Sequence, residues 1–190
     1  MSPTQKSVYI ALLAAQATII AILESFIPNI FAFAPGAKLG LSNMITMVAI
    51  FTLSRRDAFK VVTMRLLLTT LLTGTLSTFM YSVSGSYLSF LGMLLIRQLG
   101  PKRVSFIGIS ACGGILFNIG QLIVASLMAG SFTVMLYLPI LSLSGLLAGI
   151  VVGIIANFMM RNIASINKIQ SVDAKENTLS LVWYQFTQSK

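Results

Sequence analysis

The sequence predicts an all-α, polytopic membrane protein, and three observations predict it: the composition, the spacing of the apolar stretches and the placement of the basic residues. Of 190 residues, 56% are hydrophobic and 9% are charged, and the mean hydropathy is +0.91. Soluble domains carry about 25% charged residues. A membrane protein presents apolar side chains to lipid as well as to its own core. The composition therefore favours a chain embedded in a bilayer.

Charge and turn clusters divide the chain into six apolar stretches, which we expect to be transmembrane helices. They cover residues 8–23, 41–53, 58–76, 87–99, 104–129 and 137–160. The second and fourth are shorter than the roughly 20 residues that a perpendicular helix needs, so either can extend into the adjoining loop. Residues 1–161 then form one six-helix domain, and 162–190 form a polar cytoplasmic tail. We expect the first stretch to be a retained helix, because no small-residue cleavage site follows it.

The basic residues lie on alternate connections of this six-helix arrangement. Eleven of the 13 Lys and Arg residues fall on one side: Lys6, Arg55, Arg56, Lys60, Arg97, Lys102, Arg103, Arg161, Lys168, Lys175 and Lys190. The positive-inside rule places that side, and both termini, in the cytoplasm of a multi-pass cell-membrane protein. The net charge of +9 is thereby explained by topology, and we expect no nucleic-acid partner. The predicted outer connections, 25–40, 77–86 and 130–136, hold a single cation, Lys38.

Several kinds of catalytic and metal site are excluded by composition. The chain has no histidine and one cysteine, Cys112, so it has no His-based triad, HExxH zinc site, intrachain disulfide or CxxC site. Cys112 is expected to be a small buried apolar residue. No Walker motif is present, so the chain does not hydrolyse ATP by itself. We expect no catalytic residue, no metal site and no intrinsic cofactor.

Arg65 is the costliest residue to place in a membrane. It lies roughly 10 Å into the helix that begins near Ala58, where a cation costs about 2.5–3.5 kcal/mol and normally has a polar partner. Two interpretations stay open. Arg65 either braces neighbouring helices or reaches the inner surface, or it takes part in substrate binding or gating.

The sequence around Lys38 suggests a shaped turn at the outer surface. The segment 35–43 reads PGAKLGLSN, and its proline and glycines let the backbone approach a ligand closely. Lys38, with Asn43 at the start of the next helix, can receive a carboxylate or a phosphate. The alternative is a lysine that contacts anionic headgroups.

Two further segments carry candidate binding groups. Asn118 and Gln121 belong to a small-and-polar stripe of the fifth helix, and such amides must bond to protein, water or ligand. They either hold helices together or line a cavity that opens outward. The stretch 81–87 reads YSVSGSY and is predicted to be a flexible lid, with Tyr81, Ser84 and Tyr87 facing a flat ligand. The alternative is an interfacial aromatic belt.

Small residues on two helices predict close helix contacts. The first helix carries Ala11 and Ala15, and the sixth carries glycines at positions 145, 149 and 153. Spacing alone leaves open which of the two ridges packs inside the chain and which contacts a partner.

Taken together, these segments resemble the Gx transporter family, also known as heptaprenyl diphosphate synthase component I. The resemblance covers roughly residues 8–160 and is carried by PGAKLGLSN at 35–43, the Arg65 helix, YSVSG at 81–85, GISACGG at 108–114, NIGQ at 118–121 and Leu138-Pro139. That family is similar to the substrate-binding S components of energy-coupling factor (ECF) importers. Members commonly have His before the Asn of NxGQ, where this chain has Phe117, so a contact made by that His is missing here.

The resemblance implies a six-helix S-component-like bundle with a substrate cavity near the outer surface. Ala11 and Ala15 would contact a shared transmembrane T component, which carries two ATPases that use ATP. Lys38, Asn43, Asn118 and Gln121 would surround the cavity. The expected function is therefore capture of a scarce nutrient without enzymatic activity. A flat amphipathic molecule fits, either haem or another porphyrin, or a quinone or isoprenoid precursor.

Two other functions stay open. A stand-alone secondary carrier would need internal repeats or intramembrane acids, and Glu24 is the one acid near a predicted span. A membrane subunit that assists prenyl diphosphate synthesis is the second alternative. Elongation itself needs Asp-rich motifs that hold Mg²⁺, and Asp57 and Asp173 are isolated in the sequence.

Overall fold

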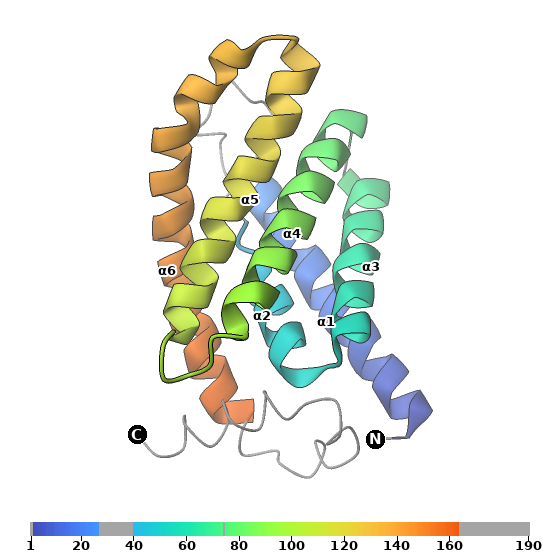
Figure 1. The fold of residues 1–190 in the computed structure, drawn as a ribbon. Helices are drawn as coiled ribbons and strands as arrows, with labels where there is room; N and C mark the ends of the chain where they lie inside the picture. The colour runs from blue at the N-terminus through green and yellow to red at the C-terminus, as the bar shows by residue number, and fades with distance from the viewer. Residues whose placement is uncertain (1, 27–39, 74, 164–190) are drawn as a thin grey trace.

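A computed structural model of the protein describes residues 2–26, 40–73 and 75–163, with side chains up to residue 159. In these ranges the chain forms six α-helices, one short 3₁₀ helix and no strand (Figure 1). They are α1 (Pro3–Ser25), α2 (Asn43–Thr52), α3 (Arg55–Thr73), α4 (Leu76–Arg97), α5 (Phe106–Ala129), η1 (Phe132–Tyr137) and α6 (Leu138–Ile163). The predicted all-α fold is confirmed. The predicted tail, 162–190, lies outside the described residues beyond position 163.

In the bundle α5 lies between α4 and α6, while α1 packs against α3 (Figure 1). Polar residues set several helix ends. Ser2 with Gln5, and Thr75 with Thr78, form reciprocal capping boxes at the starts of α1 and α4, and these satisfy backbone N–H groups that a helix leaves unpaired. At the end of α5, Gly130 adopts φ +59, a conformation that glycine takes without strain.

Glycine allows α5 and α6 to touch backbone to backbone. A Cβ on Gly114 would lie 2.1 Å from the carbonyl oxygen of Gly145, and one on Gly149 would lie 2.6 Å from the Cα of Ala111. Because real Cβ atoms never come so close, no other residue fits at either position without moving a helix. The glycine ridge of α6 therefore packs inside the chain. This answers the question that its spacing left open.

The short helix α2 lies inside the bundle. Its residues Asn43 and 45–51 are all buried, and Ile45, Met47 and Phe51 are 2% exposed or less. Ten residues span about 15 Å, roughly half of the hydrocarbon core. At its end, Nη1 of Arg97 donates to the carbonyl of Ile50 at 2.6 Å, and the guanidinium lies 4.9 Å from the ring centre of Phe51. Arg97 thus ties α4 to the last turn of α2, where carbonyls lack helical partners.

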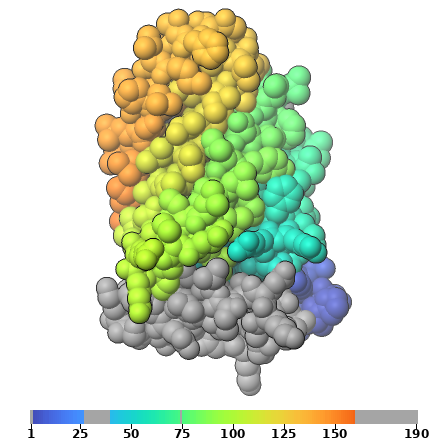
Figure 2. Space-filling view, in the orientation of Figure 1, coloured from blue at the N-terminus to red at the C-terminus, as the bar shows by residue number. Residues whose placement is uncertain are grey.

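The exterior of the bundle is apolar. In α6, Ile140, Leu147 and Phe158 are more than half exposed, and Leu71 of α3 is 82% exposed. Figure 2 shows the broad face that α4 and α5 form beside α6. Within the described residues, α1, α4, α5 and the stretch 132–159 are long and apolar enough to cross a membrane. A chain with such a surface is a membrane protein, whereas the six-span count stays a prediction.

The predicted outer loop at 77–86 is wrong. Residues 76–97 are one continuous helix, α4, so Tyr81, Ser84 and Tyr87 lie on a helix and do not form a flexible lid. Small polar residues pack here instead of breaking the helix. Ser84 donates to the carbonyl of Gly120 at 2.8 Å, and a Cβ on Gly85 would lie 2.8 Å from the carbonyl oxygen of Phe117.

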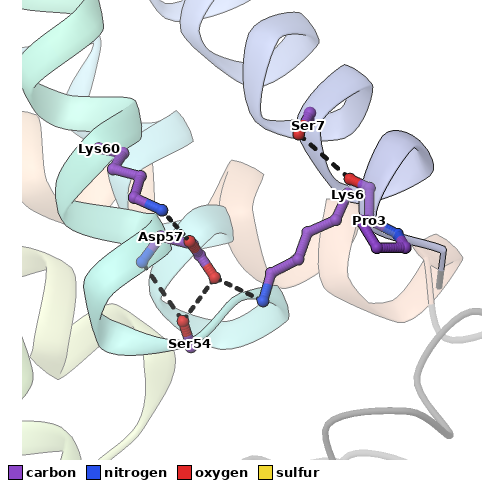
Figure 3. A network of polar contacts seen from close by, with 6 residues as sticks. All are labelled: Pro3, Lys6, Ser7, Ser54, Asp57 and Lys60. Carbon is purple, nitrogen blue, oxygen red and sulfur yellow. Dashed lines mark hydrogen bonds and ion pairs between the residues drawn. The ribbon is translucent and has the colours of Figure 1, made fainter.

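The described basic residues of the alternate connections gather at one end of the bundle. The start of α1, the α2–α3 connection, the α4–α5 connection and the end of α6 all lie at the lower end of Figure 1. Lys6 of α1 and Asp57 of α3 form an ion pair at 2.7 Å there, and Lys60 pairs with the same carboxylate at 2.9 Å (Figure 3). The chain therefore separates charge along its axis, as the alternate placement predicted.

Candidate functional site

The strongest concentration of buried polar groups surrounds Arg65, near the middle of α3. Its side chain is 3% exposed. Nη1 donates a hydrogen bond to Oγ of Ser42, just before α2, and Nη2 donates to Oγ of Ser86 in α4. Arg65 thus joins three segments of the bundle at a depth where a bare cation is unfavourable. The sequence indicated that Arg65 needs a partner, and these two serines are the partners.

Glu24 supplies the opposite charge. It lies in the last turn of α1 and is 5% exposed. Oε1 accepts a hydrogen bond from the backbone N–H of Gly40 at 2.5 Å, and the carboxylate lies close enough to Arg65 to act on it electrostatically. Each charge of such a buried pair compensates the other, so removing one partner leaves an uncompensated charge inside the bundle. Sequence reasoning missed Glu24 as a site residue, although its place beside an apolar stretch was a signal.

Asn43 lies next to this pair and begins α2. It is 2% exposed, and neither Nδ2 nor Oδ1 makes a hydrogen bond. Gly40, at φ +85, brings the chain close to it. A Cβ on Gly40 would lie 3.0 Å from Nδ2 of Asn43 and 3.0 Å from Cδ1 of Phe117. We call Glu24, Gly40, Ser42, Asn43, Arg65 and Ser86 the Arg65 cluster.

The candidate residues of α4 contact neighbouring helices. Ser84 is bonded to α5, as described above. The hydroxyl of Tyr87 lies 3.2 Å from Oγ1 of Thr63, and its ring stacks on Phe59 with centroids 5.2 Å apart. Tyr81 is buried, with 8% of its surface exposed. Ser84 and Tyr87 therefore each link α4 to a neighbouring helix.

Asn118 and Gln121 are 1% and 2% exposed. Nδ2 of Asn118 donates to the carbonyl of Leu141 at 2.7 Å, whereas its Oδ1 has no hydrogen-bond partner. A Cβ on Gly145 would lie 2.7 Å from the same Nδ2, so Asn118 lies where α5 meets α6. The amide nitrogen of Asn118 therefore bonds to α6, whereas its amide oxygen forms no hydrogen bond. Its predicted role in binding stays a prediction.

The remaining candidates lie elsewhere. Lys38 falls outside the described residues. Ala11 and Ala15 are both exposed on α1, with Val8, Leu12 and Ile19 also more than half exposed on that helix. Cys112 is half-buried in α5.

The two acids of the described ranges do not come together. Glu24 lies near the end of α1, and Asp57 pairs with Lys6 near its start. Eighteen residues of helix between positions 6 and 24 correspond to about 27 Å. Glu24 and Asp57 therefore do not form a paired-carboxylate site.

Comparison with known proteins places the chain in a family. No curated protein and no solved structure matches it. One family model, described as heptaprenyl diphosphate synthase component I, matches residues 13–159. That range contains α2 to α5, most of α1 and α6, and every member of the Arg65 cluster. The match confirms the family that the sequence motifs resembled, and the chain belongs to the heptaprenyl diphosphate synthase component I family.

Proposed function

We propose that this protein is the membrane-embedded substrate-binding subunit of an ECF-type, ATP-driven importer. It captures a small, flat, amphipathic nutrient at the outer face, and porphyrins and quinone or isoprenoid precursors are candidate classes. The protein itself is not an enzyme and holds no cofactor. Energy comes from ATP used by two ATPase subunits that act through a transmembrane T component.

The observation that carries this proposal is the Arg65 cluster. Groups from α1, α3, α4 and the entry to α2 converge in it, and the Asn43 amide makes no hydrogen bond. Buried polar groups inside an apolar bundle are costly and commonly mark a substrate path. A proton-coupled carrier would need an acid that takes up and releases protons. Glu24 instead accepts a hydrogen bond from Gly40 and interacts electrostatically with Arg65, so a binding subunit is better supported than such a carrier.

The exposed face of α1 supports a partner. Ala11 and Ala15 leave a shallow strip between Val8, Leu12 and Ile19, where another helix can approach closely. The glycine ridge of α6 is already used by α5, so α1 is the better candidate for contact with the T component.

Co-purification tests the proposal. The full chain, expressed with a T component and two ATPases, should form a stable complex and take up ligand only when ATP is present. Ala11→Trp or Ala15→Trp should abolish assembly and leave ligand binding intact. Leu147→Trp, on an exposed position of α6, is the matched control and should assemble normally. A chain that never associates with these partners and transports in ATP-free liposomes would instead be a secondary carrier.

The family description favours a second function, a membrane subunit that assists prenyl diphosphate synthesis. A two-component assay separates the two. Prenyltransferase activity of a soluble partner should be the same with and without this chain if the first proposal holds. Activity that depends on the chain would support the second.

A further inference from the structure

The side chain of Asn43 differs from the other buried polar groups. Among the described residues, it is the one side chain with two buried polar atoms, Nδ2 and Oδ1, that both lack a partner, since Thr69, Ser89 and Ser110 each have a single unpartnered hydroxyl and Asn118 leaves only Oδ1 unused. Its position is nonetheless fixed, because its backbone N–H donates to the carbonyl of Gly40 at 2.9 Å. An unpaired buried amide costs free energy. A fold that keeps one, at a fixed place, points to a ligand that satisfies it.

The charges around Asn43 favour a neutral ligand group. The two terminal nitrogens of Arg65 are bonded to Ser42 and Ser86, and Glu24 acts on the same guanidinium. An anionic group would have to replace a serine and would meet the Glu24 carboxylate. A neutral group encounters neither cost.

A flat apolar surface lies beside the amide. The ring of Phe117 is 2% exposed and lies between two glycines. A Cβ on Gly40 or on Gly85 would each approach a ring carbon to 3.0 Å. When the turn that contains Gly40 moves, the ring is uncovered and an aromatic ligand can stack on it. Because Asn43 is 2% exposed, a ligand reaches it when the turn at 40–42 shifts, and Gly40 and Ser42 are the residues that Glu24 and Arg65 hold.

We propose that Asn43 is the specificity-determining residue of the substrate site and takes a neutral, flat ring whose edge carries a hydrogen-bond donor beside an acceptor. Cyclic imides and aminopurines have such an edge. The geometry is reciprocal, since a side-chain amide also presents one donor next to one acceptor and so forms two parallel hydrogen bonds. This inference rests on the proposed function of nutrient capture but replaces the ligand classes named there, because porphyrins and quinones lack such an edge.

Equilibrium binding of defined probes to the full chain in lipid nanodiscs tests the inference. The probes are lumazine, a cyclic imide, and adenine. Their controls are 1,3-dimethyllumazine and N6,N6,9-trimethyladenine, in which every N–H donor is replaced by N-methyl. Protoporphyrin IX and menadione represent the other two classes. At least one unmethylated probe should bind at least tenfold more tightly than its methylated partner, because a site built to bond a donor rejects an analogue without it.

Two variants assign the effect to Asn43. Asn43→Leu should lose the distinction between methylated and unmethylated probe, and its thermal midpoint without probe should rise because an unpaired buried amide is removed. Ser89→Ala removes another unpartnered buried group of α4, one whose Oγ would lie 3.1 Å from a Cβ on Gly113 of α5. It should keep the discrimination of the wild type.

Three results would overturn the inference. They are the same affinity for the methylated and unmethylated forms in both pairs, no binding of either unmethylated probe, and full discrimination in Asn43→Leu. Binding of protoporphyrin IX or menadione in their place would overturn this inference and leave the proposed function standing. The proposed function fails separately, in the assembly experiment above.

Discussion

At the scale of single residues, Asp57 joins α1 and α3, which both begin at the basic end of the bundle. It accepts from Lys6, from Lys60 and from Ser54 (Figure 3). Burial by itself would raise the pKa of this carboxyl. The hydrogen bonds from the two lysines and the serine outweigh burial and hold the pKa well below its usual value of 3.8.

Asp57→Asn should therefore destabilise the protein, by roughly 1–3 kcal/mol, because two lysines lose a charged acceptor. An acid with a lowered folded-state pKa stabilises fully above its unfolded-state pKa and loses that effect as the pH falls through the folded value. The wild type should keep this contribution from pH 7 to about 5 and lose it progressively below about 4. Thermal unfolding in detergent across this pH range measures it.

The control for Asp57 is Lys60→Gln. The Lys60 side chain is 63% exposed, so its removal should cost under about 1 kcal/mol. A variant Asp57→Asn with the wild-type pH profile would show that the ion pairs contribute nothing.

Among the described glycines, Gly114 leaves the least room for a Cβ against the backbone of a neighbouring helix. In Gly114→Ala the new methyl would meet the carbonyl oxygen of Gly145 at 2.1 Å, so α5 and α6 must separate, at a cost of roughly 1–3 kcal/mol. Gly108→Ala in the same helix meets the side chain of Val104 at 3.1 Å and should be nearly neutral. Thermal aggregation in detergent compares the two. Equal midpoints would contradict backbone contact between α5 and α6.

At the scale of elements, the sequence predicted α5 well and α4 poorly. The predicted limits of the fifth helix, 104–129, match the end of α5 and differ from it by two residues at the start. The end was predictable because the long apolar run stops at Gly130. In α4, Ser82, Ser84 and Gly85 suggested a loop because they favour turns in water. Inside the bundle the same residues let helices approach and bond. Hydropathy does not record which neighbour a small polar residue contacts.

The Arg65 cluster also shows what sequence reasoning supplies and what it leaves out. The depth of Arg65 predicted a polar partner. Its partners Ser42 and Ser86, at separations of 23 and 21 residues, depend on how α2 and α4 pack around α3. Glu24 and Gly40, 16 residues apart, likewise meet only through the fold. A single sequence gives no signal for such pairings.

Arg65→Met should destabilise the entry to α2, because the carboxylate of Glu24 loses its counter-charge and Ser42 and Ser86 lose their donor. Breaking a buried pair by removing one partner costs roughly 3–5 kcal/mol. The double variant Glu24→Gln with Arg65→Met should cost less than the sum of the two single variants, since it leaves no lone buried charge. Strict additivity in thermal unfolding would show that the two residues do not interact.

At the scale of the whole molecule, charge separation along the bundle fixes how it should sit in a membrane. The start of α3 and the α4–α5 connection lie at the lower end of Figure 1 and carry the exposed Arg55, Arg56, Lys102 and Arg103. The opposite end, around η1, carries exposed apolar residues such as Phe132 and Leu136. Basic loops remain in the cytoplasm, so the η1 end should face outward, and both chain ends should face inward.

Labelling of single cysteines in intact cells measures this orientation. In a Cys112→Ala background, Phe132→Cys should react with a membrane-impermeant maleimide, since position 132 is 83% exposed at the η1 end. Lys102→Cys, exposed at the basic end, should react only after the membrane is permeabilised. The reverse pattern would place the basic end outside. It would also contradict the proposed function, because the start of α2, which lies opposite the basic end, would then face the cytoplasm.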